Sequence, residues 1–560
     1  MNPPKVVQSN YILQRSFAGG INTSVPPDLI ADDELVDSLN FEFNEDDHLT
    51  TRAGVNTWGD ITYPGRITSL HSYLNDAGDD WILSTSRNKL YASSNDGVTT
   101  DITGSLNLSD NPYWQWINFA GIAIGTNGAT TFDNPIKVEG ATPTASLLGG
   151  TPPSLKFIVL WNERLWAVDA ANPNTVVSSK LGDPEDWTDT GADGAVQIDV
   201  GKNDGDRITG LHVFDGKLFV FKRRKIYYIG SLSGTNPFDV GNLIADLYTS
   251  GIGCVSGYSI KEIINDVLFL SEYGVCSLVS APLGQLKSSV VSRKVKELES
   301  YKKGSPEISA YVCEKANQYW LMMPDVSSSR NQYEIYVLDY SRLSEGRLRW
   351  LRFDGKIAGT WATNLLVNNE NLTLIASQDR KIYSYRPQLY DVGAVWDTAI
   401  WDVSKWDTPI ASKFLDVTTP YTKSFRTKAF NFGVPVIRKK FARFAFITTL
   451  LSNDLNLKVR YFFDKILSYG DEYNLVMAVQ KSVGQWDVSK WDEANWDEEE
   501  NRDLPIYRQY KRNKKGRKAL NCTFIVSNDL NQGFVFRDLH LEIVPLNRRQ
   551  VNQVGRIQGD

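Results

Sequence analysis

The stretch RITGLHVFDGKLFVFKRRKIYYIG, residues 207–230, decides the fold class of this chain. Two apolar runs, ITGLHVF and KLFVFK, flank the pair Asp215-Gly216, and a further run, KIYYIG, follows a short basic turn. An Asp-Gly pair between two strand-like runs is typical of a tight β-hairpin turn. The stretch therefore predicts a β-hairpin followed by another strand.

The same phrase recurs along the chain from about residue 66 to about residue 390. Each copy joins an apolar run, a turn, and a Lys or Arg that precedes an apolar or aromatic pair, as in NKLYASS, ERLWAVD and RKIYSYR. The copies group into candidate units at residues 66–106, 111–150, 153–190, 195–246, 250–295, 307–355 and 357–390. A period of about 40 to 50 residues is the length of a four-stranded propeller blade. We therefore predict an all-β fold with a β-propeller of about six or seven blades at residues 61–392; a stack of β-sandwiches is the alternative.

The sequence changes character after these repeats, and residues 393–560 indicate a second domain rich in β-strands. Segments such as KKFARFAFITTLL and LNLKVRYFFD alternate apolar and polar residues, which is typical of strands with one buried face. A β-sandwich-like platform is the expected architecture. Residues 1–60 are expected to form an arm laid along the rest of the protein, with a short acidic helix at Asp32–Leu39.

Six of the 16 tryptophans occur as Trp-Asp pairs with a spacing of five residues. They lie in two inserts of the second domain, residues 394–410 and 485–500, and are Trp396, Trp401, Trp406, Trp486, Trp491 and Trp496. This spacing lines neither one face of a strand nor one face of a helix, so a series of small turns is the better description. The duplication indicates a structural device that braces the platform or joins neighbouring subunits, and sugar stacking by the indole rings is the alternative.

Two basic clusters stand out against a net charge of -6. The first follows the acidic run EANWDEEENRD within about twenty residues, and such adjacency suggests self-complementation, either within one chain or between identical chains in a ring, of which we prefer the second. The candidate interface residues are therefore Glu498, Glu499, Glu500, Lys511, Arg512, Lys514 and Lys515. The second cluster, Lys222, Arg223, Arg224 and Lys225, is a candidate for proximity to DNA, and a solvated turn is the alternative.

The composition gives no support to several classes of function. The four cysteines are far apart without a CxxC pair, and the four histidines show neither HxH nor HExxH spacing. We therefore predict no metal, no cofactor, no catalytic residues and no enzymatic activity. The N-terminal sequence has no apolar signal segment, and no run approaches the roughly 18 apolar residues of a membrane span. We expect a soluble chain made in a reducing cytosol.

Several phrases of the chain resemble the tail nozzle proteins of short-tailed bacteriophages, also called tail tubular protein B. The opening phrase FAGGIN at residues 17–22 is followed by an acidic stretch that ends near Asn40 and by Arg52-Ala53-Gly54. Further matches are SSKLGDPEDW at 178–187, the stretch 207–230, GCVSGYSI at 253–260, VLFLSEYGV at 267–275 and AFNFGVPVIRKKFARF at 429–444. The two Trp-Asp inserts also look like that group, so the likeness covers most of the chain.

Membership of that family would imply a β-propeller and a β-rich platform assembled as a six-fold ring around the DNA channel of a virion tail. The partners would be identical subunits, an adaptor protein above the ring, fibre or needle proteins, and the genome passing transiently. The role would be passive, retaining packaged DNA and conducting it during ejection. A mildly acidic chain suits a lumen along which phosphates slide. The alternatives are a host-receptor or glycan-binding tail component and an enzyme that degrades a surface polysaccharide.

Overall fold

The computed structural model describes residues 10–14, 17–110, 113–128, 134–231, 235–236, 238–279, 290–300, 308–324, 333–367, 370–385, 414–431, 438–451, 454–464, 470–478, 506–512 and 518–545. The chain divides into two compact units. One unit is Val55–Pro387, and the other combines Met1–Gly54 with Gln388–Asp560. The division differs from the expected boundaries by several residues, and it assigns the N-terminal segment to the C-terminal unit.

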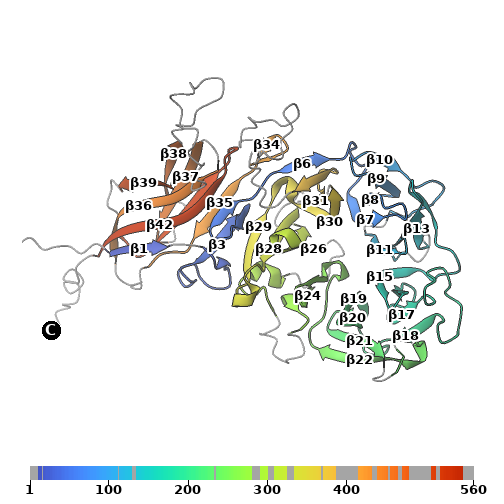
Figure 1. Ribbon diagram of the computed structural model, residues 1–560. Coiled ribbons are helices and arrows are strands. Elements are labelled where there is room, and N and C mark those ends of the chain that lie inside the picture. Colours follow the sequence, from blue (N-terminus) through green and yellow to red (C-terminus); the bar gives the residue numbers. More distant parts are fainter. Residues whose placement is uncertain are drawn as a thin grey trace, which may run out of the picture. The chain divides into compact units, whose positions relative to one another are not determined.

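The unit Val55–Pro387 is a β-propeller, and its described residues form seven antiparallel sheets, as Figure 1 shows. Blades 1 and 2 consist of β7 (Ile67–Leu74), β8 (Asp80–Ser86), β9 (Lys89–Ser93) and β10 (Thr99–Asp101), then β11 (Gln115–Phe119), β12 (Ile122–Thr126), β13 (Ile136–Glu139) and β14 (Thr144–Leu147). Blades 3 and 4 consist of β15 (Leu155–Trp161), β16 (Arg164–Asp169), β17 (Thr175–Ser178) and β18 (Val196–Asp199), then β19 (Ile208–Phe214), β20 (Lys217–Lys222), β21 (Lys225–Ser231) and β22 (Leu243–Ser250).

Blades 5 to 7 complete the series. They contain β23 (Lys261–Ile263), β24 (Asp266–Ser271) and β25 (Gly274–Ser277), then β26 (Ser309–Cys313), β27 (Gln318–Pro324), β28 (Tyr333–Asp339) and β29 (Arg349–Phe353), and finally β30 (Gly359–Val367), β31 (Glu370–Ser377) and β32 (Ile382–Tyr385) with β6 (Val55–Trp58). Short 3-10 helices are η1 (Val240–Asn242), η2 (Gly257–Ser259), η4 (Lys296–Ser300), η5 (Glu314–Ala316), η6 (Leu343–Glu345) and η7 (Gly355–Ile357). The predicted all-β fold with a propeller of about six or seven blades is confirmed.

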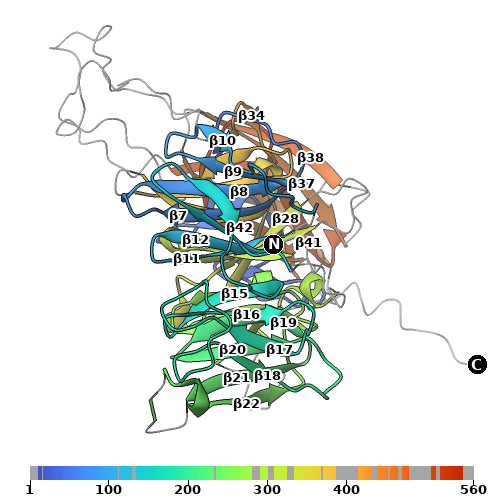
Figure 2. The same cartoon turned by 90° about the vertical axis from the view of Figure 1, so that its right-hand side faces the viewer.

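The ring closes through a strand from the beginning of the unit. Strand β6 pairs antiparallel with β32, with Val55 opposite Tyr385 and Trp58 opposite Ile382, so that it forms the outer strand of blade 7. The first strand of blade 7, β30, contacts β7 of blade 1. Figure 2 turns the ring to its side, with the sheets of blades 1 to 4 following one another from top to bottom. Closure of this kind leaves no long free sheet edge within the ring.

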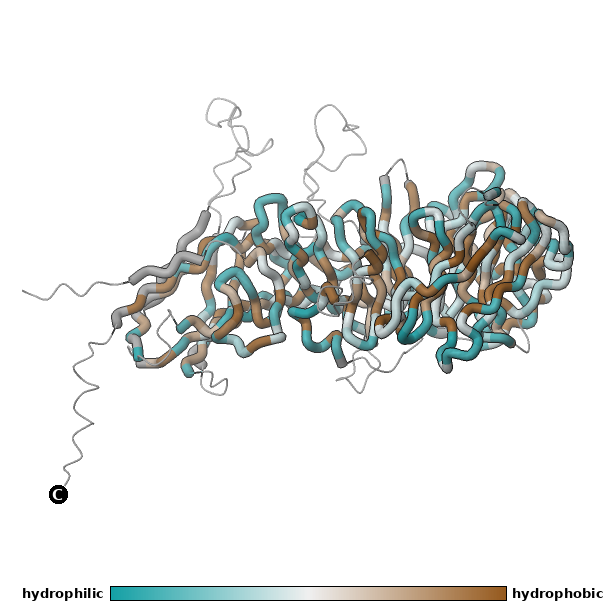
Figure 3. Tube along the Cα trace, turned by 90° about the horizontal axis from the view of Figure 1, so that it is seen from below, coloured by the Kyte–Doolittle hydropathy of each residue, from teal (hydrophilic) through white to brown (hydrophobic). Residues whose placement is uncertain are grey.

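The hydrophobic core of the propeller lies between adjacent blades. In β20, Leu218 and Val220 belong to the cluster shared with blade 3, while Phe219 and Phe221 belong to the cluster shared with blade 5. Because side chains alternate between the two faces of a strand, a strand buried on both faces needs a continuous apolar run. That requirement explains KLFVFK, and Figure 3 shows such hydrophobic runs in brown within the strands and hydrophilic turns in teal.

The described residues of the other unit form two large β-sheets and a small hairpin. The first has the order β39 (Ile506–Arg512), β36 (Lys439–Leu450), β42 (Phe534–Pro545), β5 (Leu49–Thr51) and β4 (Phe41–Phe43), with β1 (Asn10–Gln14) beside β42 and β40 (Lys518–Ala519) beside β36. The second has the order β3 (Glu34–Leu39), β35 (Lys423–Thr427), β41 (Cys522–Asn528), β37 (Asp454–Phe463) and β38 (Gly470–Ala478), with β2 (Gly20–Ile21) beside β3. A small hairpin is formed by β33 (Leu415–Asp416) and β34 (Thr419–Pro420).

Aromatic side chains join these two sheets into a sandwich. Phe425 of β35 lies 4.9 Å, between ring centroids, from Phe536 of β42. Phe524 of β41 lies 5.4 Å from Phe444 of β36 by the same measure, and these residues are buried. Offset and edge-to-face aromatic contacts of this length stabilise a core beyond the apolar area that they bury. The β-sandwich-like platform predicted from alternating strands is thus the observed architecture.

The helix expected at Asp32–Leu39 was wrong. Residues Glu34–Leu39 form β3, which pairs in parallel with β2 and antiparallel with β35. The acidic residues suggested a helix start, but pairing with distant strands overrides weak local propensity. The expected arm is therefore an integral part of the platform, because β1 to β5 contribute to both of its sheets.

Candidate functional site

The N-terminal phrase that ends in Arg52-Ala53-Gly54 forms a buried ionic junction inside the platform. Both Nη atoms of Arg52 donate to the two carboxylate oxygens of Asp416, each at 2.9 Å. The Nε atom donates to Asn40 Oδ1 at 2.9 Å, and the Tyr421 hydroxyl donates to the Arg52 carbonyl. A bidentate pair between an arginine and a carboxylate is geometrically specific as well as strong. Arg52 is 0% exposed, so this junction is a structural anchor and not an accessible binding surface.

Lys423 extends this junction on the other side of Tyr421. The Arg52 guanidinium carbon lies 3.8 Å from the Tyr421 ring centroid, and the Lys423 ammonium nitrogen lies 4.5 Å from it. The ammonium also donates to the Leu530 carbonyl oxygen at 2.6 Å. Burial, and then the nearby Arg52 charge, lower the pKa of Lys423 from 10.5 to about 7. The platform therefore contains a lysine that titrates near neutral pH.

The Gly-Gly-Ile-Asn phrase forms a tight crossing against Glu34. A Cβ atom on Gly19 would lie 2.6 Å from the Glu34 Cγ atom, and Gly20 has a φ of +68°. Glu34 accepts hydrogen bonds from the Asn22 side chain at 2.7 Å and from the Ala31 amide at 2.8 Å. Glycine is required where the backbone approaches this closely or adopts a positive φ. These motif residues therefore have a structural role, because their packing and hydrogen bonds fix the conformation of the segment.

Lys222, the first residue of the predicted DNA-proximal cluster, is buried in a cage of oxygen atoms. Its ammonium donates to Asp204 Oδ1 at 3.0 Å and to the Gly201 carbonyl at 3.0 Å. Asn174 Oδ1 lies 3.1 Å away, and the Asp206 carbonyl accepts at 3.3 Å. The Lys222 side chain is 0% exposed, so it is not available to a DNA phosphate. A sequence cannot distinguish such an internal lysine from a solvated one, because the cage comes from two other loops.

The remaining three residues of that cluster are ion-paired. Arg223 and Arg224 both contact Glu272, with nitrogen to oxygen distances of 2.5 and 3.3 Å, and Lys225 lies 3.5 Å from Asp204. Burial alone would raise the pKa of Glu272, but the two arginines lower it. Arg223 and Arg224 remain accessible at 45% and 70% of their side chains. Their contact with DNA stays a prediction.

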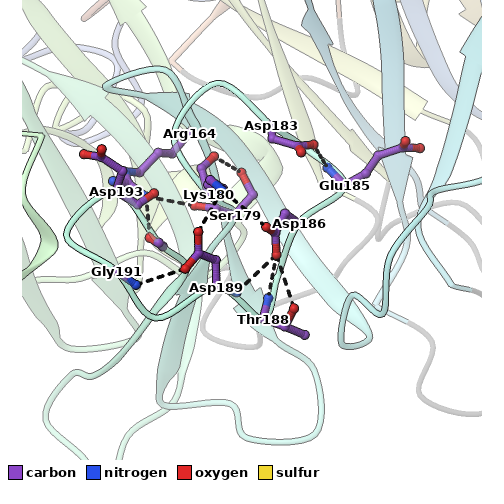
Figure 4. Close-up of polar contacts among 11 residues, drawn as sticks. Arg164, Ser179, Lys180, Asp183, Glu185, Asp186, Thr188, Asp189, Gly191 and Asp193 are labelled. Atoms are coloured by element: carbon purple, nitrogen blue, oxygen red, sulfur yellow. Dashed lines mark hydrogen bonds and ion pairs between the residues drawn. The ribbon is translucent and has the colours of Figure 1, made fainter.

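The phrase SSKLGDPEDW opens an acidic loop, residues 179–194, between β17 and β18, which Figure 4 shows in close-up. Lys180 is ion-paired with Asp189 at 2.7 Å. Asp186 Oδ1 accepts from the Thr188 and Asp189 amides at 3.1 Å each. These backbone hydrogen bonds lower the pKa of Asp186, and the Lys180 contact, with the Gly191 amide, lowers the pKa of Asp189. The loop thus carries carboxylates that stay ionised.

The buried side chain of Arg164 forms hydrogen bonds with backbone carbonyls of this acidic loop. Its guanidinium donates to the carbonyl oxygens of Ser179 at 3.2 Å and Asp193 at 2.9 Å, and also to that of Gly194. The same group donates to the Phe238 carbonyl at 2.9 Å. Arg164 is 1% exposed, and its planar fork of donors contacts several backbone carbonyls at once. The loop is therefore held by polar contacts with the buried Arg164 side chain.

Aromatic rings from blades 2, 5 and 7 meet on the axis of the propeller. Tyr113, which precedes β11, lies 5.4 Å from Tyr258 of η2 and 6.0 Å from Trp361 of β30, between ring centroids. Tyr258 and Trp361 are 5.4 Å apart by the same measure. No two of these three blades are adjacent in the ring, so their side chains can touch only across its centre.

The proposed interface residues are mostly beyond what the structure describes. Lys511 and Arg512 lie in β39, opposite Phe444 and Arg443 of β36. The others lie outside the described residues, and they are Trp396, Trp401, Trp406, Trp486, Trp491, Trp496, Glu498, Glu499, Glu500, Lys514 and Lys515. Their contribution to an interface stays a prediction.

The chemistry-bearing residue types do not converge on a metal centre in the described part of the chain. No group of three or more His, Cys, Asp or Glu residues there is arranged to hold a metal ion. Cys254, Cys276, Cys313 and Cys522 are all free and buried, and burial raises the pKa of the Cys276 thiol to about 11. Among the described residues there is also no helix of the length and apolar character that a membrane crossing requires.

Sequence reasoning missed the residues that complete these sites. Asp416 and Tyr421 follow Arg52 by more than 360 residues, and no local pattern marks either of them. The three axial aromatics are likewise indistinguishable from ordinary core residues in the sequence. Lys222 likewise carries no local signal, because the oxygen atoms that surround its ammonium come from other loops.

Comparisons with known proteins identify no family for this chain. No protein-family model matches the chain, and no curated protein matches it. Among solved structures, the chain is similar to one titled "Streptogramin B lyase structure", with 12% sequence identity and a TM-score of 0.36. The match covers 60% of this chain and 98% of that chain. Similarity at this level carries no argument about activity or substrate.

Proposed function

We propose that this chain is a structural protein of a short phage tail, a nozzle-type subunit that assembles with copies of itself around a DNA channel. The support is the set of phrases that resemble tail nozzle proteins, spread over most of the chain. The fold agrees with the architecture that this resemblance implies, since a propeller is inserted between the two parts of a β-sandwich platform. The proposed location is the virion tail, after synthesis in the host cytoplasm.

The observation that carries most weight is the contact of three aromatic rings from non-adjacent parts of the propeller. Tyr113, Tyr258 and Trp361 lie 5.4 to 6.0 Å apart between ring centroids, and we infer that they close the centre of the ring to DNA. A conducting function therefore requires a channel between several chains, and we propose a homo-hexameric ring for it. An adaptor protein above the ring and fibre or needle proteins below it are the further proposed partners.

The negative charge of the chain supports a channel along which DNA slides, in preference to a surface that binds the DNA backbone. The net charge is -6, and the acidic loop at residues 179–194 holds Asp186 and Asp189 ionised. Carboxylates repel phosphates, so a lumen bearing them favours sliding, whereas basic side chains would bind the backbone and release counterions. The proposed mechanism is passive and requires no catalytic residue.

The oligomeric state tests this proposal. Sedimentation velocity and electron-microscope class averages of the purified full chain, with and without its neighbouring tail proteins, are expected to show a closed ring with six-fold symmetry. A trimer would favour a receptor-binding spike instead. A monomer that persists at high concentration and in the presence of the other tail proteins would contradict the proposal, as would a lumen that is positive throughout.

A glycan-binding or polysaccharide-degrading role predicts a different result. For that role, the isolated chain should bind or cleave capsule or lipopolysaccharide, and substitution of Trp401 and Trp491 should abolish binding. For a nozzle subunit we expect no such binding and no such cleavage.

A further inference from the structure

We propose that the platform contains a site of covalent self-modification, at which the side-chain amine of Lys423 and the carboxamide of Asn528 form an intramolecular isopeptide bond. Lys423 begins β35 and Asn528 ends β41, and the two residues lie directly opposite each other in this antiparallel pair. Opposed residues of antiparallel strands have their Cβ atoms about 5 Å apart on one face of the sheet. Figure 1 shows β35 and β37, the strands on either side of β41. The inference does not depend on the nozzle function.

The two side chains are in contact and shielded from water. Lys423 Nζ lies 3.5 Å from Asn528 Oδ1, the oxygen bonded to the carbon that the amine would attack. Lys423 is 0% exposed and Asn528 is 2% exposed. Groups that a fold holds at about 3 to 3.5 Å from each other react far faster than the same groups free in solution. The paired strands therefore supply the proximity that this reaction needs.

The Lys423 amine is available in its neutral, nucleophilic form. Burial, and then the charge of Arg52, lower its pKa to about 7, while Asp416 and Asp529 act in the opposite direction. The ring of Tyr421, with its centroid 4.5 Å from Nζ, is the aromatic group beside it. Near pH 7 about half of the molecules thus carry an uncharged amine, whose lone pair can attack a carbonyl carbon.

Hydrogen bonds fix and polarise the Asn528 carboxamide. Its Oδ1 atom accepts from the Leu530 amide at 3.0 Å, and its Nδ2 atom donates to the Asn456 carbonyl at 2.8 Å and to Gln532 Oε1 at 3.0 Å. A backbone N–H group on the attacked carbonyl stabilises the negative charge that develops on the oxygen. The Leu530 carbonyl in turn accepts from Lys423 Nζ at 2.6 Å. One short loop therefore positions both reacting groups.

The reaction balances without a further reactant. The bond between Lys423 Nζ and Asn528 Cγ forms, the bond between Cγ and Nδ2 breaks, and a proton of the amine leaves with Nδ2 as ammonia. Nothing is oxidised or reduced. The groups that contact Nζ are uncharged, so they offer no strong base for this proton transfer, and we expect a slow reaction. The titration of Lys423 is a property of the chain in which the amine is still free.

Intact-mass spectrometry of the full chain tests the proposal. The chain is purified at about pH 6 and then kept for several days at about pH 6 or about pH 9. We expect the mass to fall by that of one ammonia, about tenfold faster at the higher pH, because the neutral fraction of an amine with a pKa of about 7 rises by that factor. Peptide mapping should find a branched peptide that joins the segments containing Lys423 and Asn528.

Variants separate this bond from other reactions that release ammonia. Lys423→Arg and Asn528→Ser should each keep the full mass under the same conditions. Lys458→Arg is the matched control, because Lys458 of β37 also lies opposite an asparagine of the neighbouring strand, the exposed Asn474 of β38. This variant should lose ammonia as the wild type does. Circular dichroism and the melting temperature establish that each variant is folded before the incubation.

Two outcomes would overturn the proposal. The first is a wild-type chain that keeps its full mass after incubation at about pH 9, where the amine is almost wholly neutral. The second is a loss of ammonia that persists in folded Lys423→Arg and yields no branched peptide. That result would indicate a succinimide at an asparagine, which releases ammonia without a lysine.

Discussion

At the scale of single residues, buried cations that are matched by distant oxygen atoms recur in this protein. Lys222 is held by groups from two loops, and Arg164 donates to the Asp193 carbonyl of the acidic loop and to the Phe238 carbonyl outside it. Removing one member of such a set leaves the others buried without a partner, which costs more than the pair contributes. The role of these buried cations is therefore defined by the oxygen atoms that bind them.

Lys222→Met is expected to destabilise the propeller. The substitution leaves the Asp204 carboxylate, which is 9% exposed, without its main partner, and a loss of about 3 kcal/mol is the usual cost of breaking a buried pair. The melting temperature of the propeller transition measures the effect. Lys202→Met is the control, because the Lys202 side chain is 66% exposed. Equal melting temperatures for the two variants would contradict the structural role of the cage.

The platform should become more stable as the pH rises from about 7 toward 9, because of Lys423. The folded pKa is about 7 and the ordinary value is 10.5, so between these values the unfolded chain binds more protons than the folded chain. Stability therefore rises with pH in that window and is lost as the pH falls toward 7. Urea unfolding of wild type and Lys423→Met at several pH values measures it. The slope should be smaller in the variant, and identical slopes would exclude Lys423 as the cause.

At the scale of elements, each blade depends on its neighbours more than on its own strands. Both faces of β20 are buried, by blade 3 on one side and by blade 5 on the other. A single sheet of this kind cannot bury its faces alone, so the ring must close to protect its last blade. Strand β6 provides that closure by pairing with β32. The stability of blade 7 therefore depends on a strand that precedes blade 1 in the sequence.

Val55→Asp is expected to open this closure. Val55 is 0% exposed in β6, and an unpaired carboxylate there should destabilise the strand by about 3 kcal/mol. Hydrogen exchange of Ile382–Tyr385 should become faster, since β32 loses its outer neighbour. Asn56→Asp introduces the same charge at the adjacent, exposed position of the same strand and should leave exchange unchanged. Unchanged protection of β32 in the Val55 variant would show that the ring closes without β6.

At the scale of the whole molecule, the two compact units have different parts in the proposed assembly. The propeller closes its own ring through β6, whereas the platform carries the two Trp-Asp inserts at residues 394–410 and 485–500. Duplicated inserts in one domain suit repeated contacts between identical subunits. The assembly of the ring is therefore expected to depend on the platform.

Deletion of residues 394–407 is expected to weaken ring assembly and to leave the propeller folded. The reason is that this segment contains Trp396, Trp401 and Trp406 and lies outside the unit Val55–Pro387. Sedimentation velocity measures the assembly, and the melting transition of the propeller is the internal control. A ring that forms with unchanged affinity would exclude this insert as an interface.

Much of the propeller was predictable from sequence, because its determinants are local. The apolar run KLFVFK, the Asp215-Gly216 turn and their repeats along the chain mark strands and hairpins without reference to distant residues. The candidate units at 66–106 and 307–355 accordingly coincide with blades 1 and 6. The helix expected at Asp32–Leu39 failed because β3 is stabilised by β2 and β35, and the second of these follows it by nearly 400 residues.

The sequence by itself thus determined that this protein is a repeated all-β chain with a propeller followed by an alternating β-rich domain. Only the tertiary structure decided that β6 closes the ring, that Arg52 meets Asp416, that Lys222 is buried, and that Tyr258 contacts Trp361. The physical reason is the separation along the sequence over which each interaction acts. Strand periodicity and turn chemistry act between neighbours in the chain, whereas ion pairs, axial contacts and strand closure join residues that only the complete fold brings together.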